Sequence, residues 1–288
     1  MNDAIAGMLK RYDCKSLSDH VLALREILQE IALLGLWRSK FFEKAAFYGG
    51  TSLRLLHGQD RFSEDLDFSL LFPIKGFDLS LYSNALQKEL AAFGFDVQVD
   101  NRPKTAGSAI QSAFLKANTL SQLLVIQATP MYLQRMHREQ VLKIKIEVDT
   151  DPPPGFDTET RFILLPIQFA VRVYELPDLF AGKMHAILCR RWKNRSKGRD
   201  WYGLVWYATH QPRLHITHLE QQMRQTGHWT KDGPPSPGDL NQLIENAIEN
   251  LNVDQVRKEV EPFVKNPMNL EIWSHLFFRE LVKKIQVI

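Results

Sequence analysis

The stretch F-Y-G-G-T-S-L-R-L-L-H-G-Q-D-R-F-S-E-D-L-D-F, residues 47–68, decides the fold. Its first part ends a predicted strand and opens an amphipathic helical turn at Gly49, Gly50 and Thr51. Glycine lets the backbone approach a ligand closely, and N–H groups at a helix start attract anions. The turn is therefore a candidate anion-binding site.

Two carboxylates follow this turn, and Asp65 lies 14 residues after Thr51. Residues 66–70 alternate between apolar and polar side chains, which predicts a strand with Asp65 and Asp67 on one face. A hard divalent cation takes such oxygen ligands while keeping positions for water and phosphate. A surface turn before a half-exposed strand is the alternative, but the glycine turn favours the functional interpretation.

A third carboxylate lies on the clearest predicted strand, V-L-K-I-K-I-E-V at residues 141–148. Its apolar side chains share one face, and Glu147 lies on the other, followed on the same side by Asp149. Clustered carboxylates raise one another's pKa unless cations neutralise them, which favours a metal-dependent phosphoryl or nucleotidyl transferase. Glu147 is preferred to Asp149 because it is nearer the strand centre, and a charged edge strand is the structural alternative.

Composition bounds the class of protein. The chain has 288 residues, 44% hydrophobic and 24% charged, which argues against a disordered, collagen-like or disulfide-scaffold protein. The net charge of +3 is too small to indicate a nucleic-acid binder by itself. Cys14 and Cys189 belong to no metal-spacing motif, and no signal peptide or membrane span is visible. We therefore expect a cytoplasmic protein without membrane contact.

The pattern of elements predicts a mixed α/β (α+β) fold followed by an all-helical part. We expect two domains, residues 1–175 with a mixed sheet and flanking helices, and residues 176–288 with helices alone. Apolar spacing predicts helices over residues 17–37, 40–46, 178–189 and 270–285, among others.

Residues 183–200 concentrate positive charge, with seven cations against one acid, a net charge of +6. The cations are Lys183, Arg190, Arg191, Lys193, Arg195, Lys197 and Arg199. Trp192 and Trp201 lie within and beside this basic segment, and cations with aromatic rings can grip phosphates and stack bases. A solvated loop between helices is an equally weighted alternative. His185, on the helix of Lys183, is interpreted as a packing residue.

In combination these motifs resemble the AbiEii/AbiGii-type nucleotidyltransferase toxins of the DNA polymerase β-like superfamily. In that family a Gly-Gly-Thr or Gly-Ser turn precedes Arg-x-Ser-x-Asp-Leu-Asp-Phe, matched here by residues 61–68. A Lys-hydrophobic-acidic strand matches residues 145–147, and a Glu-Leu-x6-Lys helix matches residues 175–183. A Lys-x-Arg-Asp-x-Tyr segment matches residues 197–204, although Gly203 stands where many members carry a second acid.

The resemblance, over about residues 45–207, implies transfer of an NMP from an NTP to an acceptor hydroxyl. It implies triphosphate binding by Gly49, Gly50, Thr51 and Lys183. It implies Mg²⁺ or Mn²⁺ binding by Asp65, Asp67 and Glu147, with Asp200 positioning or deprotonating the acceptor. It further implies a toxin of a toxin–antitoxin or phage-defence (abortive infection) system, with RNA or tRNA as acceptor and a cognate antitoxin as partner.

Two other functions compete with this interpretation. One is a nucleotidyltransferase of the same fold that modifies a small molecule such as an antibiotic. The other is a non-catalytic module that keeps the fold and binds a nucleotide. The basic segment favours RNA over a small molecule, and the intact set of mutually repelling acids argues against the non-catalytic module.

Overall fold

The computed structural model describes residues 3–102, 108–126, 139–190 and 197–288. The chain divides into two compact units, each described here by itself. The N-terminal unit comprises Met1–Gly58, Phe62–Pro152 and Glu159–Val173. The C-terminal unit comprises Gln59–Arg61, Pro153–Thr158 and Tyr174–Ile288. No helix in the ranges given above is long and apolar enough to cross a membrane.

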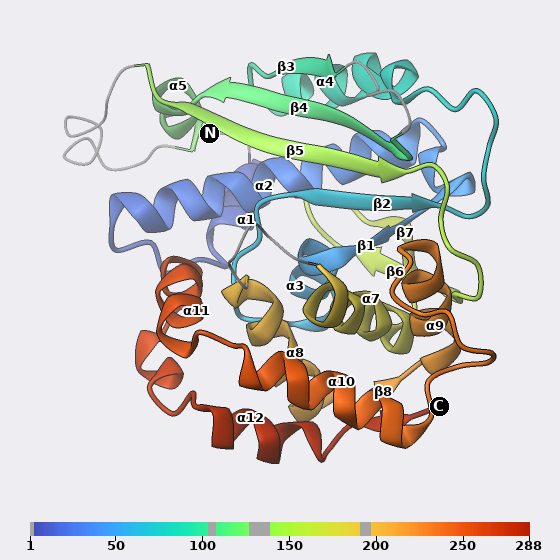
Figure 1. The fold of residues 1–288 in the computed structure, drawn as a ribbon. Coiled ribbons are helices and arrows are strands. Elements are labelled where there is room, and N and C mark those ends of the chain that lie inside the picture. The colour runs from blue at the N-terminus through green and yellow to red at the C-terminus, as the bar shows by residue number, and fades with distance from the viewer. Residues whose placement is uncertain (1–2, 103–107, 127–138, 191–196) are drawn as a thin grey trace. The chain divides into compact units, whose positions relative to one another are not determined.

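The N-terminal unit is built on a mixed sheet (Figure 1). Its seven described strands are β1 (Ala45–Tyr48), β2 (Leu66–Leu70), β3 (Gln98–Arg102), β4 (Ile110–Asn118), β5 (Val141–Asp149), β6 (Thr158–Ile163) and β7 (Phe169–Tyr174). They are ordered β3-β4-β5-β2-β1-β7-β6. Strand β2 pairs antiparallel with β1 and parallel with β5, and the predicted mixed α/β class is confirmed.

Helices flank this sheet. They are α1 (Asp3–Leu9), α2 (Leu17–Arg38), η1 (Phe41–Glu43), α3 (Gly49–His57), η2 (Leu79–Tyr82), α4 (Ser83–Ala92) and α5 (Thr119–Val125). The long helix α2 packs against α1, α4, α5 and β5. The helix predicted over residues 40–46 is wrong, because Lys40 adopts a left-handed conformation and Ala45 already begins β1.

The core of this unit is aromatic beneath the acidic strands. Phe68 alternates with Asp67 on β2 and is fully buried, with its ring 4.9 Å from that of Phe41 and 5.2 Å from that of Phe47. Offset and edge-on ring contacts of this kind add to the burial of apolar area. The apolar face of β2 therefore anchors the strand while its other face presents the carboxylate.

The C-terminal unit is helical apart from one short strand pair. Its elements are α7 (Leu176–Cys189), α8 (Gly198–His210), β8 (Arg213–Leu214), α9 (Ile216–Gln225), α10 (Pro237–Glu249), α11 (Val253–Val260), η3 (Glu261–Phe263), η4 (Pro267–Leu270), α12 (His275–Val282) and β9 (Gln286–Val287). Helix α7 packs on α8, α9 and α10, and β8 pairs parallel with β9. The helix predicted over residues 270–285 begins later, because the Ser274 side chain caps a new helix start.

Candidate active site

The glycine turn lies at the junction of β1 and α3. Tyr48 ends the strand, and no side chain caps the helix that begins at Gly49. Gly49 has a φ of +82°, and a Cβ added there would lie 2.5 Å from Oδ2 of Asp67. A non-glycine residue would therefore be strained in its backbone and would collide with a carboxylate. The sequence motif is explained by this close approach.

Sheet pairing places two of the predicted carboxylates side by side. Asp67 on β2 is in register with Glu147 on β5 and with Tyr48 on β1. Neighbouring strands are about 4.8 Å apart, and paired residues project to the same face. Lys145 also projects here, with its Nζ 2.6 Å from Oε1 of Glu147. Asp67 and Glu147 are therefore adjacent acids on this face, and Lys145 forms an ion pair with one of them.

The alternative third carboxylate, Asp149, has different surroundings. It pairs with Ser69 rather than with an acid, and its Oδ1 accepts the backbone N–H of Asp151 at 3.0 Å. Burial raises the pKa of Asp149 despite that hydrogen bond. The register therefore favours Glu147 over Asp149 as the neighbour of Asp67.

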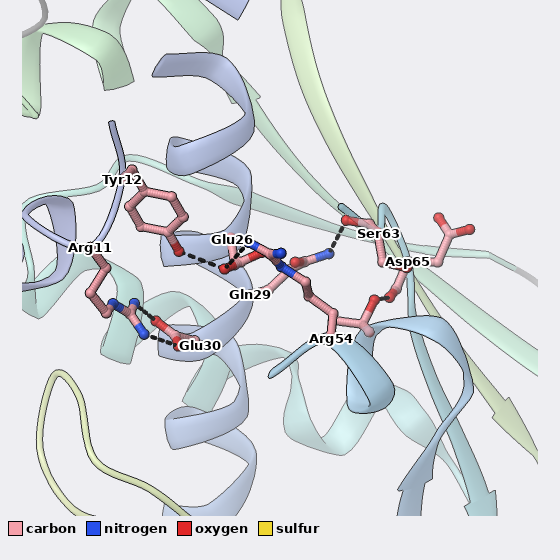
Figure 2. Close-up of polar contacts among 9 residues, drawn as sticks. Arg11, Tyr12, Glu26, Gln29, Glu30, Arg54, Ser63 and Asp65 are labelled. Atoms are coloured by element: carbon pink, nitrogen blue, oxygen red, sulfur yellow. Dashed lines mark hydrogen bonds and ion pairs between the residues drawn. The ribbon is translucent and has the colours of Figure 1, made fainter. Parts of the chain in front are cut away.

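Asp65 precedes β2 and is held through its backbone. The buried Thr51 hydroxyl donates a hydrogen bond to the Asp65 carbonyl oxygen, so this hydroxyl serves to fix the acidic segment. In Figure 2 the Asp65 carboxylate points away from Arg54 and Glu26. The Thr51 contact joins the start of α3 directly to the start of β2.

A buried polar network on α2 supports both segments (Figure 2). Nε of Arg54, on α3, lies 2.8 Å from Oε2 of Glu26, and their side chains are 12% and 9% exposed. Gln29 Nε2 donates to the Ser63 carbonyl oxygen at 3.2 Å, which ties the loop before β2 to the same helix. Tyr12 donates to Oε1 of Glu26 at 2.8 Å.

These supporting residues were not predicted from the sequence. Glu26, Gln29 and Glu30 are buried on a helix whose neighbouring positions are apolar. Charged residues are almost never fully buried unless they are paired, so acids within an apolar helical stretch were the available signal. Glu30 is paired with Arg11, and burial raises the pKa of Glu30 despite this pairing.

In the C-terminal unit, Lys183 and Asp200 form a close pair. Nζ of Lys183 on α7 lies 2.7 Å from Oδ1 of Asp200 on α8, and the side chains are 17% and 13% exposed. Burial opposes ionisation of Asp200, but Lys183, assisted by Arg190 and Lys197, outweighs it and lowers the pKa of this carboxyl. Asp200 is therefore ionised at neutral pH.

Gly203 makes room for this lysine. A Cβ at Gly203 would lie 3.1 Å from Cε and 3.2 Å from Cδ of Lys183, tighter than ordinary side-chain contacts. A second acid at this position would have to displace the lysine stem. Glycine at position 203, where many family members carry an acid, therefore leaves the space that the Lys183 side chain occupies.

The structure describes part of the basic segment. Arg190, Lys197 and Arg199 are described, whereas Arg191, Lys193, Arg195 and Trp192 lie outside the described residues. The Arg199 guanidinium lies 4.9 Å from the Phe263 ring centroid, and burial lowers the pKa of Lys197. Trp201 is 3% exposed and packs on Phe278, so its predicted availability for base stacking is wrong.

The start of α8 is a second close backbone approach. A Cβ at Gly198 would lie 2.0 Å from the carbonyl oxygen of Val256, and the Gly198 N–H donates to Glu259 at 2.7 Å. Glycine is therefore required where the basic segment enters α8.

Among the described residues, two groups of three side chains could hold a metal ion, and both lie in the C-terminal unit. Within each group the potential ligand atoms lie within 4.8 Å of one another. They are Asp157, Asp178 and His215, and His185, Cys189 and His228. In the first group Asp178 accepts the Asp157 N–H at 3.0 Å and lies 2.6 Å from Nδ1 of His215. Neither group contains the predicted acids of the N-terminal unit.

A mixed sheet with acids on neighbouring strands beside a glycine turn is the make-up of the nucleotidyltransferase class. The family described as "Nucleotidyl transferase AbiEii toxin, Type IV TA system" matches residues 31–279. The chain therefore belongs to this toxin family, and the resemblance stated from the motifs is confirmed.

Two solved structures from Helicobacter pylori are similar to the chain at low identity. JHP933 is 15% identical, with 90% of this chain and 89% of that chain covered and a TM-score of 0.47. A protein provisionally described as a nucleotidyltransferase is 17% identical, with 90% and 91% covered and a TM-score of 0.45. No curated protein matches the chain.

Replacing Gly49 by alanine should destabilise the N-terminal unit more than replacing Gly58. Both residues have positive φ, +82° and +77°, so each substitution should cost about 1–2 kcal/mol of backbone strain. A Cβ at Gly58 would meet nothing within 4 Å, whereas a Cβ at Gly49 would collide with Asp67. This collision should add about 1–3 kcal/mol to the loss of stability in the Gly49 variant. Urea unfolding of the two variants measures the difference, and equal losses would contradict the close approach.

Glu26→Gln should lower the free energy of unfolding by about 3–5 kcal/mol, because the buried Arg54 charge loses this carboxylate. The matched control is Glu43→Gln, which breaks an exposed pair in the same unit, with side chains 78% (Lys40) and 66% (Glu43) exposed. That control should change stability by less than about 1 kcal/mol. Urea denaturation checks both variants, and similar effects would show that the Figure 2 network is not important for stability.

Proposed function

We propose that this chain transfers a nucleoside monophosphate from an NTP to an acceptor hydroxyl and releases pyrophosphate. The observation that carries the proposal is the pairing of Asp67 with Glu147 directly beside the Gly49 backbone. Membership of the nucleotidyl transferase toxin family supports the same reaction. In the reaction the acceptor oxygen bonds to the α-phosphorus and its proton leaves to solvent, while the bond to the pyrophosphate oxygen breaks.

The donor set fits a hard divalent cation, Mg²⁺ or Mn²⁺, held by Asp65, Asp67 and Glu147. Carboxylate oxygens are the ligands that Mg²⁺ prefers, and Gly49 keeps free a space against Asp67 that a single Cβ would fill. When bound, the ion supplies positive charge that stabilises the transferring phosphoryl group. Lys145 offsets part of the Glu147 charge in the structure.

The triphosphate is proposed to bind at the start of α3. The N–H groups of Gly49, Gly50 and Thr51 open a helix without a side-chain cap, and such groups favour negative charge. The Thr51 hydroxyl already donates to Asp65, so Thr51 contributes through its amide. The same short segment then binds the phosphates through its N–H groups and holds the acidic segment through the Thr51 hydroxyl.

Lys183 and Asp200 are proposed to act as a charged pair in the same reaction. Lys183 would contact the triphosphate and offset its negative charge. The lowered pKa of Asp200 makes it a weak base at neutral pH, which favours a positioning role over deprotonation of the acceptor. Asp200 holds the ammonium of Lys183 at 2.7 Å and so orients it.

The acceptor is proposed to be RNA, with tRNA included, and the partner a cognate antitoxin. The net charge of +6 over residues 183–200 supports a polyanionic acceptor, because phosphate contacts by Lys and Arg dominate nucleic-acid affinity. The type IV toxin–antitoxin family implies the antitoxin. Both NTP and RNA are cytoplasmic, so the proposed place of action is the cytoplasm.

Asp67→Asn, Glu147→Gln and Lys183→Ala should each reduce NMP transfer at least roughly 100-fold, because each removes charge that stabilises the transferring group. The assay follows label from each NTP into total RNA with Mg²⁺ or Mn²⁺ present, in parallel with growth inhibition on expression. Asp149→Asn, on the same strand face as Glu147, is the control and should stay within a few-fold of wild type.

Two results would overturn this assignment. Growth inhibition that persists in Asp67→Asn after transfer is lost would indicate a non-catalytic binding module. An inactive Asp149→Asn with an active Glu147→Gln would move the third carboxylate to Asp149.

Neutralising Arg191, Lys193 and Arg195 together should weaken RNA binding and flatten its dependence on salt. Counterion release predicts that each lost phosphate contact reduces the slope of log K against log salt by roughly 0.7–0.9. The control neutralises the exposed Lys44, Lys75 and Lys88, which should leave the slope unchanged. Affinity for NTP should survive in both variants. An unchanged slope in the first variant would favour a small-molecule acceptor.

A further inference from the structure

The C-terminal unit contains a cluster of chemically active side chains from α7 and from the turn after α9. His185 and Cys189 are one helical turn apart and buried, and His228 lies exposed in the turn after α9. Their potential ligand atoms all lie within 4.8 Å of one another. From the sequence alone, His185 is interpreted as a packing residue and His228 is not singled out.

Hydrogen bonds orient both imidazole rings. Nε2 of His185 and Nδ1 of His228 each lie 2.9 Å from Oγ1 of Thr226, which also bonds the Gln222 carbonyl at 3.0 Å. The hydroxyl has a single proton, so at least one ring must donate its N–H to Oγ1. That ring then keeps a lone pair on its other nitrogen. Metal-binding histidines are commonly oriented in this way, by a hydrogen bond from the ring nitrogen that does not bind the ion.

Burial keeps the His185 ring neutral, as a metal ligand must be, whereas Cys189 would have to lose its proton to the ion. Burial, assisted by Arg190 and the nearby histidines, lowers the pKa of His185 to about 4, so its ring is neutral at pH 7. Burial also raises the pKa of Cys189 to about 11, which keeps it a thiol without an ion. A bound ion would replace the thiol proton, with one proton released to solvent as the metal–sulfur bond forms.

We propose that His185, Cys189 and His228 bind a divalent transition-metal ion of the Zn²⁺ class. Two imidazole nitrogens and one thiolate are the donors that Zn²⁺ takes, whereas Mg²⁺ prefers oxygen. His228 is exposed, which provides a path for the ion to enter. The ion would tie α7 to the turn at residues 226–228.

The site would stiffen the helix that carries Lys183. His185 follows Lys183 by two residues on α7, and the turn contributing His228 directly follows α9. A metal bound by residues from both segments holds them at a fixed separation, since its bonds to nitrogen and sulfur have narrow length ranges. The proposal does not depend on the reaction proposed above.

The test is a Co²⁺ titration of chelator-treated full-length protein without NTP or RNA. Wild type should show a thiolate-to-cobalt charge-transfer band, and Zn²⁺ should abolish the band by competition and raise the melting temperature. Cys189→Ser should lose the band, and His228→Ala, at an exposed position, should weaken Co²⁺ affinity at least roughly tenfold. Thr226→Val should weaken it roughly 10–100-fold.

The controls are Cys14→Ser, which changes the other cysteine, and His215→Ala, which belongs to the separate aspartate group. Both should keep the band and the affinity of wild type. Absence of the band in wild type would overturn the proposal. So would a band retained in Cys189→Ser or lost in Cys14→Ser.

Discussion

The close approach of the Gly49 backbone to the Asp67 carboxylate is the constraint on which the N-terminal unit depends. It requires glycine at the start of α3, directly after the point where Tyr48 pairs with Asp67 in the β1–β2 register. A separate pairing, the parallel register of β2 against β5, places Asp67 next to Glu147. Helix α2 anchors α3 through the ion pair between Glu26 and Arg54, which lies one turn into α3.

Elements with strong local patterns could be predicted from the sequence. The alternation that predicted a strand over residues 141–148 is confirmed by β5, and the helix predicted over residues 17–37 is confirmed by α2. The start of β1 could not be found this way, because it follows a left-handed Lys40 that no periodicity reveals. The break before α12 depends on one side-chain cap, at Ser274, inside an otherwise helical pattern.

The residues of the candidate site likewise divide into those that a local motif reveals and those that depend on distant parts of the chain. Gly49, Asp65 and Asp67 lie in one short motif, so spacing alone indicated them. The sequence favoured Glu147 over Asp149 only by its place nearer the strand centre, whereas its position beside Asp67 is set by pairing between distant segments. The buried acids of α2 and the histidine–cysteine cluster of α7 were missed for the same reason, since their partners lie far away in the chain. Trp201 was misjudged because the sequence does not show which face of α8 is buried.

The parallel pairing of β2 with β5 also has a consequence for protein synthesis. Asp67 and Glu147 are 80 residues apart in the chain, and the two strands that bring them together are joined through β3 and β4. Contacts across such separations form only after the intervening loop-closure entropy has been overcome. A product of premature termination before β5 contains the glycine turn but lacks the acid pair. Glu147 must therefore be synthesised before a nascent chain can assemble this pair.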